Sequence, residues 1–192
     1  MRVHLMYPSC KIMKYDPDKH HRRSIRLKGY DYSQSGAYFI TICTHDKKSL
    51  FGKIIDGNMV LNEFGKIVND EWIKTEQIRK NVKIDEYMVM PNHLHGIIII
   101  NDDRRDTLMR VQSESFGKPV SGSISTIIRG FKSATTKQIN EFRTPQMSVW
   151  QSNYYEHVIR NDDDLNDVRE YIINNPLKWD LDRENPINIK MS

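Results

Sequence analysis

Short apolar segments separated by turn residues indicate most of the β-strands. Residues 37–44 are rich in aromatic and β-branched side chains, which favour a core strand. Residues 53–61 hold an Asp-Gly pair between apolar flanks, the pattern of a small hairpin. Residues 82–90 predict a second core strand, and Pro91-Asn92 then turns the chain into a strand that ends in four isoleucines. The strand at residues 82–90 and the isoleucine-rich strand that follows it should therefore pair antiparallel.

Apolar residues at helical spacing predict three helices, each preceded by a side chain that can cap its first turn. Asn62 precedes the first, Ser123 the second and Asn161 the third. The third begins with three aspartates, whose carboxylates favour the positive end of a helix dipole. It should end at residue 174 or 175, because Pro176 discourages further turns. Residues 149–160 indicate an irregular segment that leads into a last strand.

The predicted order is strand, helix, strand, strand, helix, strand, helix, with a hairpin inserted before the first helix. Four strands and two crossing helices in that order describe an α+β fold, a ferredoxin-like split βαβ (RRM-like) antiparallel sheet. The crossing helices should lie on one face, with the C-terminal helix added. We expect one domain over residues 29–180, after a basic, poorly ordered segment at 1–28 and before a C-terminal tail at 181–192.

Positive charge is unevenly placed along the chain. Lys and Arg number 29 against 25 for Asp and Glu, a formal net charge of +4. Basic residues gather between positions 19 and 28, and others lie on the second predicted helix, mostly off its apolar stripe. Both groups suit contacts with nucleic-acid phosphates, although a solvated tail and an ordinary exposed helix face are the alternatives. The candidate DNA contacts are Arg22, Arg23, Arg26, Lys28, Arg129, Lys132 and Lys137.

Cysteine usage and the length of the apolar runs indicate a soluble intracellular protein. The two cysteines, Cys10 and Cys43, have no paired spacing, so neither a disulfide framework nor a zinc ribbon is indicated. The N-terminus lacks the apolar core of a signal peptide, and no stretch is long enough to span a bilayer. We therefore expect a cytoplasmic location.

Two histidines stand at the start of the isoleucine-rich strand. Side chains alternate along a strand, so His93 and His95 should point to one face and Leu94 to the other. Two imidazoles on one face can form half of a metal site, or can simply hydrogen-bond within the fold. Ile97 stands where a His-x-His-x-His hydrolase has its third histidine, and the chain has no His-Glu-x-x-His helix. A third ligand must come from elsewhere.

The last predicted helix offers a tyrosine and an amide on one face. Tyr171 and Asn175 are four residues apart, hence about one turn apart. The amide oxygen of Asn175 suits a hard cation such as Mg²⁺ or Mn²⁺, and the phenol of Tyr171 could attack a phosphodiester held by that ion. Tyr171 could equally be a packing residue at a helix edge. Tyr154 and Tyr155 are competing candidates, since aromatic pairs also stack bases.

Several segments, spread in order over about residues 22–180, form a recognisable set. They are Arg23-Ser-Ile-Arg-Leu-Lys-Gly-Tyr-Asp-Tyr32, Ala37-Tyr-Phe-Ile-Thr-Ile42, Met88-Val-Met-Pro-Asn-His-Leu-His-Gly96, Gly130-Phe-Lys-Ser-Ala134, Trp150-Gln151, Tyr154-Tyr-Glu-His157 and, most specific of all, Tyr171-Ile-Ile-Asn-Asn-Pro176. The set resembles the HUH-class tyrosine transposases, in particular the REP-associated (RAYT-like) branch.

The resemblance implies a transposase-like catalytic domain that nicks and transfers single-stranded DNA. In that family two histidines flanking a hydrophobic residue bind a divalent ion, so the resemblance gives this role, with Mg²⁺ or Mn²⁺, to His93 and His95. The matching nucleophile is Tyr171, which would form a 5′-phosphotyrosine link and release a 3′-hydroxyl. Related insertion-sequence enzymes usually have a glutamine where this chain has the shorter Asn175. The implied partner is folded, hairpin-forming single-stranded DNA, in a bacterial-type cytosol and associated with the nucleoid.

Two other functions fit the same residues. The chain could be a module that binds DNA or RNA hairpins without cleaving them, or a metal phosphoesterase that acts through water and forms no covalent species. The oligomeric state is also open. A monomer would bring its own Tyr171 to the histidines, whereas a homodimer could share its sites between chains.

Overall fold

The computed structural model describes residues 31–101, 122–182 and 184–189. The basic segment predicted at residues 1–28 lies outside these ranges. The elements, in chain order, are β1 (Gly36–Cys43), η1 (His45–Lys47), β2 (Gly52–Ile55), β3 (Asn58–Leu61), α1 (Glu63–Gln77), β4 (Val82–Val89), β5 (His93–Ile100), α3 (Ile124–Glu141), β6 (Tyr155–Ile159), α4 (Asp162–Asn174), η2 (Pro176–Leu181) and α5 (Pro186–Ile189). The strands and helices that the sequence predicts are all present.

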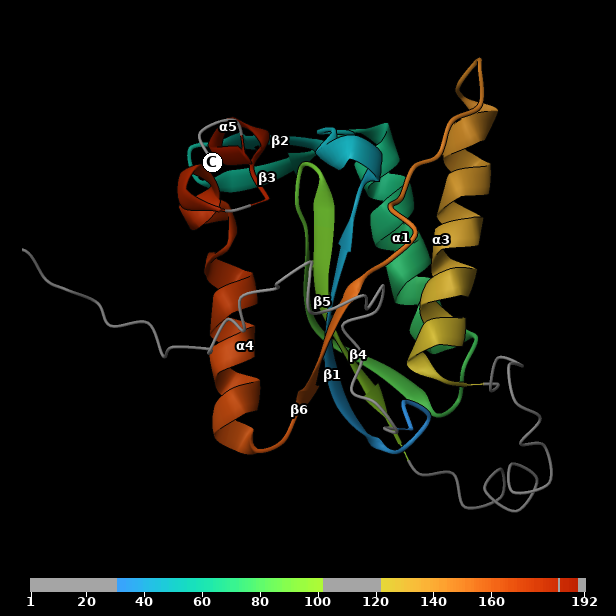
Figure 1. Ribbon diagram of the computed structural model, residues 1–192, viewed down its shortest axis with the longest axis vertical. Helices are drawn as coiled ribbons and strands as arrows, with labels where there is room; N and C mark the ends of the chain where they lie inside the picture. Colours follow the sequence, from blue (N-terminus) through green and yellow to red (C-terminus); the bar gives the residue numbers. More distant parts are fainter. Residues whose placement is uncertain (1–30, 102–121, 183, 190–192) are drawn as a thin grey trace, which may run out of the picture.

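Four antiparallel strands form the central sheet, in the order β4-β5-β1-β6. The chain passes from β1 through α1 to β4 at one edge and returns with β5 to the middle, which is the ferredoxin-like split βαβ arrangement. Figure 1 shows α1 and α3 on one face of the sheet and α4 on the other. The hairpin of β2 and β3 is a separate small sheet, next to the end of the main sheet at which β5 begins. The predicted α+β fold is confirmed.

Alternate side chains of the strands enter two apolar layers. The larger layer, under α1 and α3, includes Tyr38, Trp72 and Leu94, all completely buried. The smaller layer, under α4, consists of Phe39, Ile97, Ile159 and Ile172. Because Leu94 enters the larger layer, its neighbours His93 and His95 face α4, as strand alternation predicts.

The ends of the helices follow the sequence signals, with one difference after α4. The side chains of Asn62, Ser123 and Asn161 each accept a hydrogen bond from a backbone N–H three residues on, which satisfies a donor of the first turn. Beyond α4, however, Pro176 does not end the helical turns but begins η2. A proline fits the first position of a helix because the N–H it lacks would have no partner there. This turn brings the residues after 181 back toward the sheet.

Gly96 is required by close packing on the α1–α3 side of the sheet. A Cβ atom at this position would lie 2.6 Å from Cζ2 of Trp72, whose side chain is completely buried. We expect Gly96→Ala to lower the free energy of unfolding by about 1–3 kcal/mol, measured by urea denaturation. Gly130→Ala is the matched control, because its Cβ would meet only the flexible end of Arg79 and alanine favours a helix. Equal stability of both variants would contradict the packing argument.

The ion pair of Arg169 with Asp85 joins α4 to β4. Arg169 donates from Nε to Oδ1 of Asp85 and from Nη2 to Oδ2, both at 2.7 Å. These hydrogen bonds lower the pKa of the Asp85 carboxyl in the folded protein. A carboxyl with a depressed folded-state pKa stabilises the protein above its unfolded-state pKa, and this contribution is lost as the pH falls through the folded-state pKa.

We expect Asp85→Asn to cost about 1 kcal/mol of unfolding free energy at neutral pH, and this cost to disappear on acidification. Urea denaturation of both proteins at a series of pH values below 7 measures the difference. Asp167→Asn, an exposed change on the same helix, is the control and should not show the same pH trend. A difference between wild type and Asp85→Asn that stays constant with pH would contradict the assignment.

Within the described residues, no helix combines the length and the apolar character needed to cross a bilayer.

Candidate active site

The two histidines of β5 form a buried pair on the α4 side of the sheet. The His93 side chain is completely buried and that of His95 is 3% exposed. Their Nε2 atoms lie 2.9 Å apart, and the ring centroids are 4.4 Å apart. The strand fixes both backbones, so the two Nε2 atoms converge on one point. The predicted pairing of the imidazoles on one face is confirmed.

Each histidine is held at its other ring nitrogen by a residue that the sequence did not single out. Nδ1 of His93 lies 2.8 Å from Oδ1 of Asn92, and Nδ1 of His95 lies 2.8 Å from Oγ1 of Thr41 on the neighbouring strand β1. Partners of this kind orient metal-binding imidazoles in proteins and direct Nε2 at the ion. The arrangement therefore fits histidines that present both Nε2 atoms to a common ligand.

Asp182 completes a group of three residues that could hold a metal ion. One ligand atom from each of His93, His95 and Asp182 lies within 4.8 Å of the others. Asp182 follows η2, so only the turn of the chain after Pro176 brings it to β5. The sequence carries no signal for it, because Asp182 stands in a polar C-terminal stretch that contains other acidic residues.

Asn175, the ligand predicted from sequence, lies next to Asp182. Its Nδ2 donates to Oδ2 of Asp182 at 3.0 Å, and the residue is 3% exposed. Its Oδ1 is buried, and no hydrogen-bond partner for it is found among the described residues. A buried carbonyl oxygen without a partner is costly, and a cation is one of the groups that would satisfy it. The donor set of two imidazoles, a carboxylate and an amide oxygen fits a divalent ion of the hard or borderline class.

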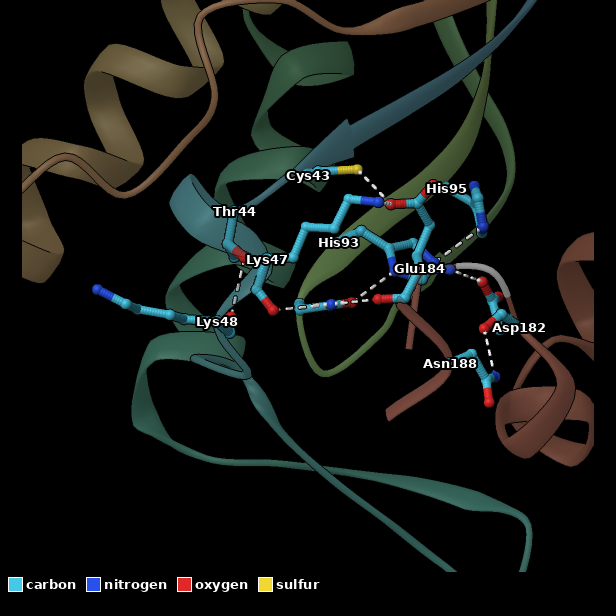
Figure 2. Close-up of polar contacts among 10 residues, drawn as sticks. Cys43, Thr44, Lys47, Lys48, His93, His95, Asp182, Glu184 and Asn188 are labelled. Atoms are coloured by element: carbon cyan, nitrogen blue, oxygen red, sulfur yellow. Dashed lines mark hydrogen bonds and ion pairs between the residues drawn. The ribbon is translucent and has the colours of Figure 1, made fainter. Parts of the chain in front are cut away.

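Glu184 joins the segment after η2 to the turn between β4 and β5 and to η1. Its carboxylate accepts from Nζ of Lys47 at 2.9 Å and from Sγ of Cys43 at 3.4 Å, and its backbone oxygen accepts from Nδ2 of Asn92 at 2.6 Å. Figure 2 shows these contacts beside His93, His95 and Asp182. The sequence predicts a tail after residue 180. The described part of that stretch contacts the turn before β5, the end of β1 and η1, and the backbone N–H of Glu184 donates to Oδ1 of Asp182 at 2.6 Å.

Tyr171 brings its phenol to the histidine pair of its own chain. The Tyr171 hydroxyl lies 3.3 Å from Nε2 of His95, and the two ring centroids are 5.2 Å apart. The ring also stands edge-on to Phe39, with centroids 6.0 Å apart, while 43% of the residue is exposed to solvent. The side chain is therefore partly open to solvent while its ring is fixed against Phe39 and His95. No second chain is needed to bring this tyrosine to the histidines.

One of the two competing tyrosines lies on the opposite face of the sheet, and the other lies on the same face as the histidines. Tyr154 packs against the α1–α3 core, on the face of the sheet opposite to the histidines. Tyr155 lies on the α4 side, with its ring centroid 6.2 Å from that of Phe39. The structure therefore places Tyr171 beside the histidine pair, adds Asp182 to that pair, and places Asn175 beside Asp182. A role of Asn175 as a metal ligand stays a prediction.

The predicted DNA contacts are only partly within the described residues. Arg22, Arg23, Arg26 and Lys28 lie outside them. Arg129 and Lys137 are exposed on α3, where Lys137 borders an open hollow of about 660 Å³ between α3 and residues 146–152.

Lys132, the third candidate on α3, donates hydrogen bonds from its ammonium group to backbone carbonyl oxygens of residues 151–153. Its Nζ donates to the carbonyl oxygens of Gln151, Ser152 and Asn153 at 2.8, 3.2 and 3.0 Å. Burial lowers the pKa of Lys132 to about 8. This side chain supports the segment before β6, and a DNA contact for it stays a prediction.

Comparison with known proteins gives one relative in sequence and a likeness in fold. No family model matches the chain. A protein of Haemophilus influenzae Rd, described as uncharacterized, is 42% identical over 174 residues, which cover 88% of this chain and 96% of that protein. The solved structure of a REP-associated tyrosine transposase bound to a REP hairpin aligns with a TM-score of 0.54 at 21% identity, over 80% of this chain and 73% of that chain.

A structure from Deinococcus radiodurans R1 aligns over 78% of this chain and 95% of that chain, but its TM-score of 0.43 at 13% identity is too low to support an argument. The fold is therefore similar to that of a REP-associated tyrosine transposase, and a histidine pair of the HUH kind is present. At 42% identity over nearly the whole of both proteins, the chain belongs to the family of the Haemophilus influenzae protein.

Proposed function

We propose that the protein is a metal-dependent nickase and strand-transferase of the transposase type, which recognises hairpins of single-stranded DNA and cleaves through a 5′-phosphotyrosine intermediate. The observation that carries the proposal is the phenol of Tyr171, 3.3 Å from Nε2 of His95 and next to a group of residues that could hold a metal ion. A solvent-accessible tyrosine beside such a group is the arrangement expected for a phosphodiester nucleophile.

The residues that would hold the ion are His93, His95 and Asp182, with Asn175 as a fourth donor through its buried Oδ1. Mg²⁺ or Mn²⁺ fits this set of nitrogen and oxygen donors. When bound, the ion polarises the phosphate and stabilises charge on the leaving oxygen. Asp182 contributes the only formal negative charge of the four, which favours a divalent cation over a neutral ligand.

The reaction of the chain itself is a transesterification. Oη of Tyr171 attacks the phosphorus, the bond to the 3′ oxygen breaks, and the phenol proton is replaced by the new bond to phosphorus. The leaving 3′ oxygen takes up a proton and becomes a 3′-hydroxyl, while the 5′ end stays on the tyrosine. The phenol has an unperturbed pKa of about 10, so positive charge at the ion site would assist the loss of its proton to solvent. The phosphotyrosine keeps the energy of the broken ester for transfer to another strand, so no nucleotide cofactor is required.

The partner proposed for this site is DNA that folds into a hairpin. The REP-associated enzyme with a similar fold was solved with a REP hairpin, which supports this choice of probe. Exposed Arg129 and Lys137 on α3, and the basic residues before position 29, are the candidate phosphate contacts. A protein with this activity would act in the cytosol at the nucleoid.

The proposal is tested by incubating the protein with end-labelled hairpin oligonucleotides and Mg²⁺ or Mn²⁺. A labelled protein–DNA adduct that resists denaturation, together with release of a 3′-hydroxyl fragment, is the expected result. Hairpin binding without any adduct would favour the non-catalytic binding module. Cleavage without an adduct would instead identify a metal phosphoesterase that uses water.

A further inference from the structure

Glu184 contacts Asp182 and three other parts of the protein at once. Its backbone N–H donates to Oδ1 of Asp182, and its backbone oxygen accepts from Nδ2 of Asn92 in the turn between β4 and β5, both at 2.6 Å. Its carboxylate accepts from Nζ of Lys47 in η1 at 2.9 Å and from Sγ of Cys43 at the end of β1 at 3.4 Å. One residue therefore links a candidate ligand of the ion to the turn before β5, to η1 and to β1.

The partner of Glu184 in the ion pair, Lys47, is fixed at its backbone. The backbone oxygen of Lys47 accepts from Nδ2 of Asn92 at 3.0 Å, so the same completely buried amide holds the backbones of both members of the pair. The Lys47 side chain is 32% exposed and that of Glu184 is 14% exposed. Solvent therefore screens this pair less than it screens a fully exposed one.

The carboxylate of Glu184 is separate from the group that could hold the ion. Figure 2 shows it beside Lys47 and Cys43, whereas that group consists of Asp182 and the two histidines of β5. The histidines are fixed by a central strand of the sheet, but Asp182 follows the 3₁₀-helix η2 and has no strand to fix it. A ligand in such a segment needs contacts from outside its own element to keep the geometry that an ion requires.

We propose that Glu184 and Lys47 are positioning residues for the divalent ion. Their ion pair docks the segment after η2 against η1, and the backbone N–H of Glu184 then orients the carboxylate of Asp182 beside the histidine pair. Neither residue contacts the ion itself. The inference rests on the proposed function only in that Asp182 is a ligand of the ion.

The effects of removing each member of the pair separate this role from two others. If charge alone mattered, Lys47→Met would strengthen cation binding and Glu184→Met would weaken it, because the two variants change the local charge in opposite directions. If Glu184 were a direct ligand, Glu184→Met alone would weaken binding. A positioning role predicts that both variants weaken it, since each removes the same ion pair.

Calorimetric titration with Mn²⁺ makes this comparison. We expect Lys47→Met and Glu184→Met each to weaken Mn²⁺ binding about tenfold, and the double variant to weaken it about tenfold as well, because the second change removes nothing more. Lys47→Arg keeps the pair and should bind Mn²⁺ about as tightly as wild type. Lys48→Met is the matched control, since Nζ of Lys48 pairs with exposed Asp46 at 3.4 Å, and its loss should not weaken Mn²⁺ binding.

Two results of the titration would overturn the inference. One is a Lys47→Met protein that binds Mn²⁺ as tightly as wild type or more tightly. The other is a double variant whose loss of affinity is the product of the two single losses. If Glu184→Met does not fold, Lys47→Met still decides the question, because its side chain is the more exposed of the two.

Amide hydrogen exchange of the metal-free protein tests the docking without an ion, DNA or activity. The backbone N–H of Glu184 donates to Asp182, and that of Asn185 donates to the backbone oxygen of Asp182 at 3.1 Å. We expect both amides to exchange faster in Lys47→Met than in wild type, while the amides of α4 keep their rates. Unchanged exchange at Glu184 and Asn185 would overturn the docking role of the pair.

Failure of this inference and failure of the proposed function give different results. A wild-type protein that does not bind Mn²⁺ would overturn the ion site and, with it, the role of the pair at that site. A wild-type protein that binds Mn²⁺ and forms the DNA adduct, together with a Lys47→Met protein that binds Mn²⁺ equally well, would overturn the positioning role alone.

Discussion

Tyr171→Phe is expected to abolish the covalent protein–DNA adduct, with a loss of at least about 10³-fold in the rate of cleavage. The change removes one oxygen, the atom that would form the bond to phosphorus. The ring contacts with Phe39 and His95 do not involve that oxygen, so the position of α4 should be kept. With 43% of the residue exposed, stability should change little. Labelled hairpin oligonucleotides with Mn²⁺, analysed on denaturing gels, measure the adduct.

Controls for this result come from the two competing tyrosines, one on each face of the sheet. Tyr154→Phe and Tyr155→Phe also remove one hydroxyl each and should leave the adduct in place. Hairpin affinity, measured without metal, should be the same for Tyr171→Phe and wild type. An adduct that survives Tyr171→Phe but is lost in Tyr155→Phe would identify Tyr155, on the edge strand β6, as the nucleophile. An adduct that survives all three single changes would show that none of these three tyrosines is the required nucleophile.

His95→Gln is expected to weaken divalent-ion binding and to prevent adduct formation. The variant loses the Nε2 atom that lies 2.9 Å from His93 and 3.3 Å from the Tyr171 hydroxyl. Loss of a ligand from a site of three or four donors should weaken Mn²⁺ binding by more than about tenfold, measured by calorimetry. Chelation of the ion should stop adduct formation by the wild type, and added Mn²⁺ should restore it.

His157→Gln is the matched control for His95→Gln. His157 also lies on a strand of the main sheet, but its Nε2 contacts Asp164 at 3.0 Å, away from the histidine pair. Its replacement should leave ion affinity unchanged. Asp182→Asn tests the third ligand in the same assay, with exposed Asp180→Asn as its own control. If His95→Gln binds Mn²⁺ as tightly as wild type, the group on β5 is not the ion site.

Local rules were enough to predict the elements of the fold. Side chains of Asn62, Ser123 and Asn161 cap the helices because each competes for backbone N–H groups at a helix start. The spacing of two between His93 and His95 puts both on one face whatever the sheet around them. Alternation also sends Leu94 into the opposite core, and this core accounts for its burial.

The full set of candidate metal-binding residues could not be predicted in the same way. Asn175 was accessible to sequence reasoning because it stands one turn after Tyr171 on a continuous helix. Asp182 was not, because it follows a change from α-helix to 3₁₀-helix at Pro176, after which helical spacing no longer relates its position to that of Tyr171. Lys132 illustrates the reverse case: it stands on a basic helix face, yet its ammonium is bound to three backbone carbonyls.

The sequence by itself determined the order of the elements, the common face of His93 and His95, and the common face of Tyr171 and Asn175. These follow from the two-residue repeat of a β-strand and the 3.6-residue repeat of an α-helix, which act over a few neighbouring residues. The tertiary structure alone decided that the two faces meet in one chain, that Asp182 joins them, and that Asn92 and Thr41 hold the outer nitrogens of the histidines. Such contacts join residues far apart in the chain, 76 positions for Tyr171 and His95, and they depend on sheet order and on packing of α4, which no local pattern encodes.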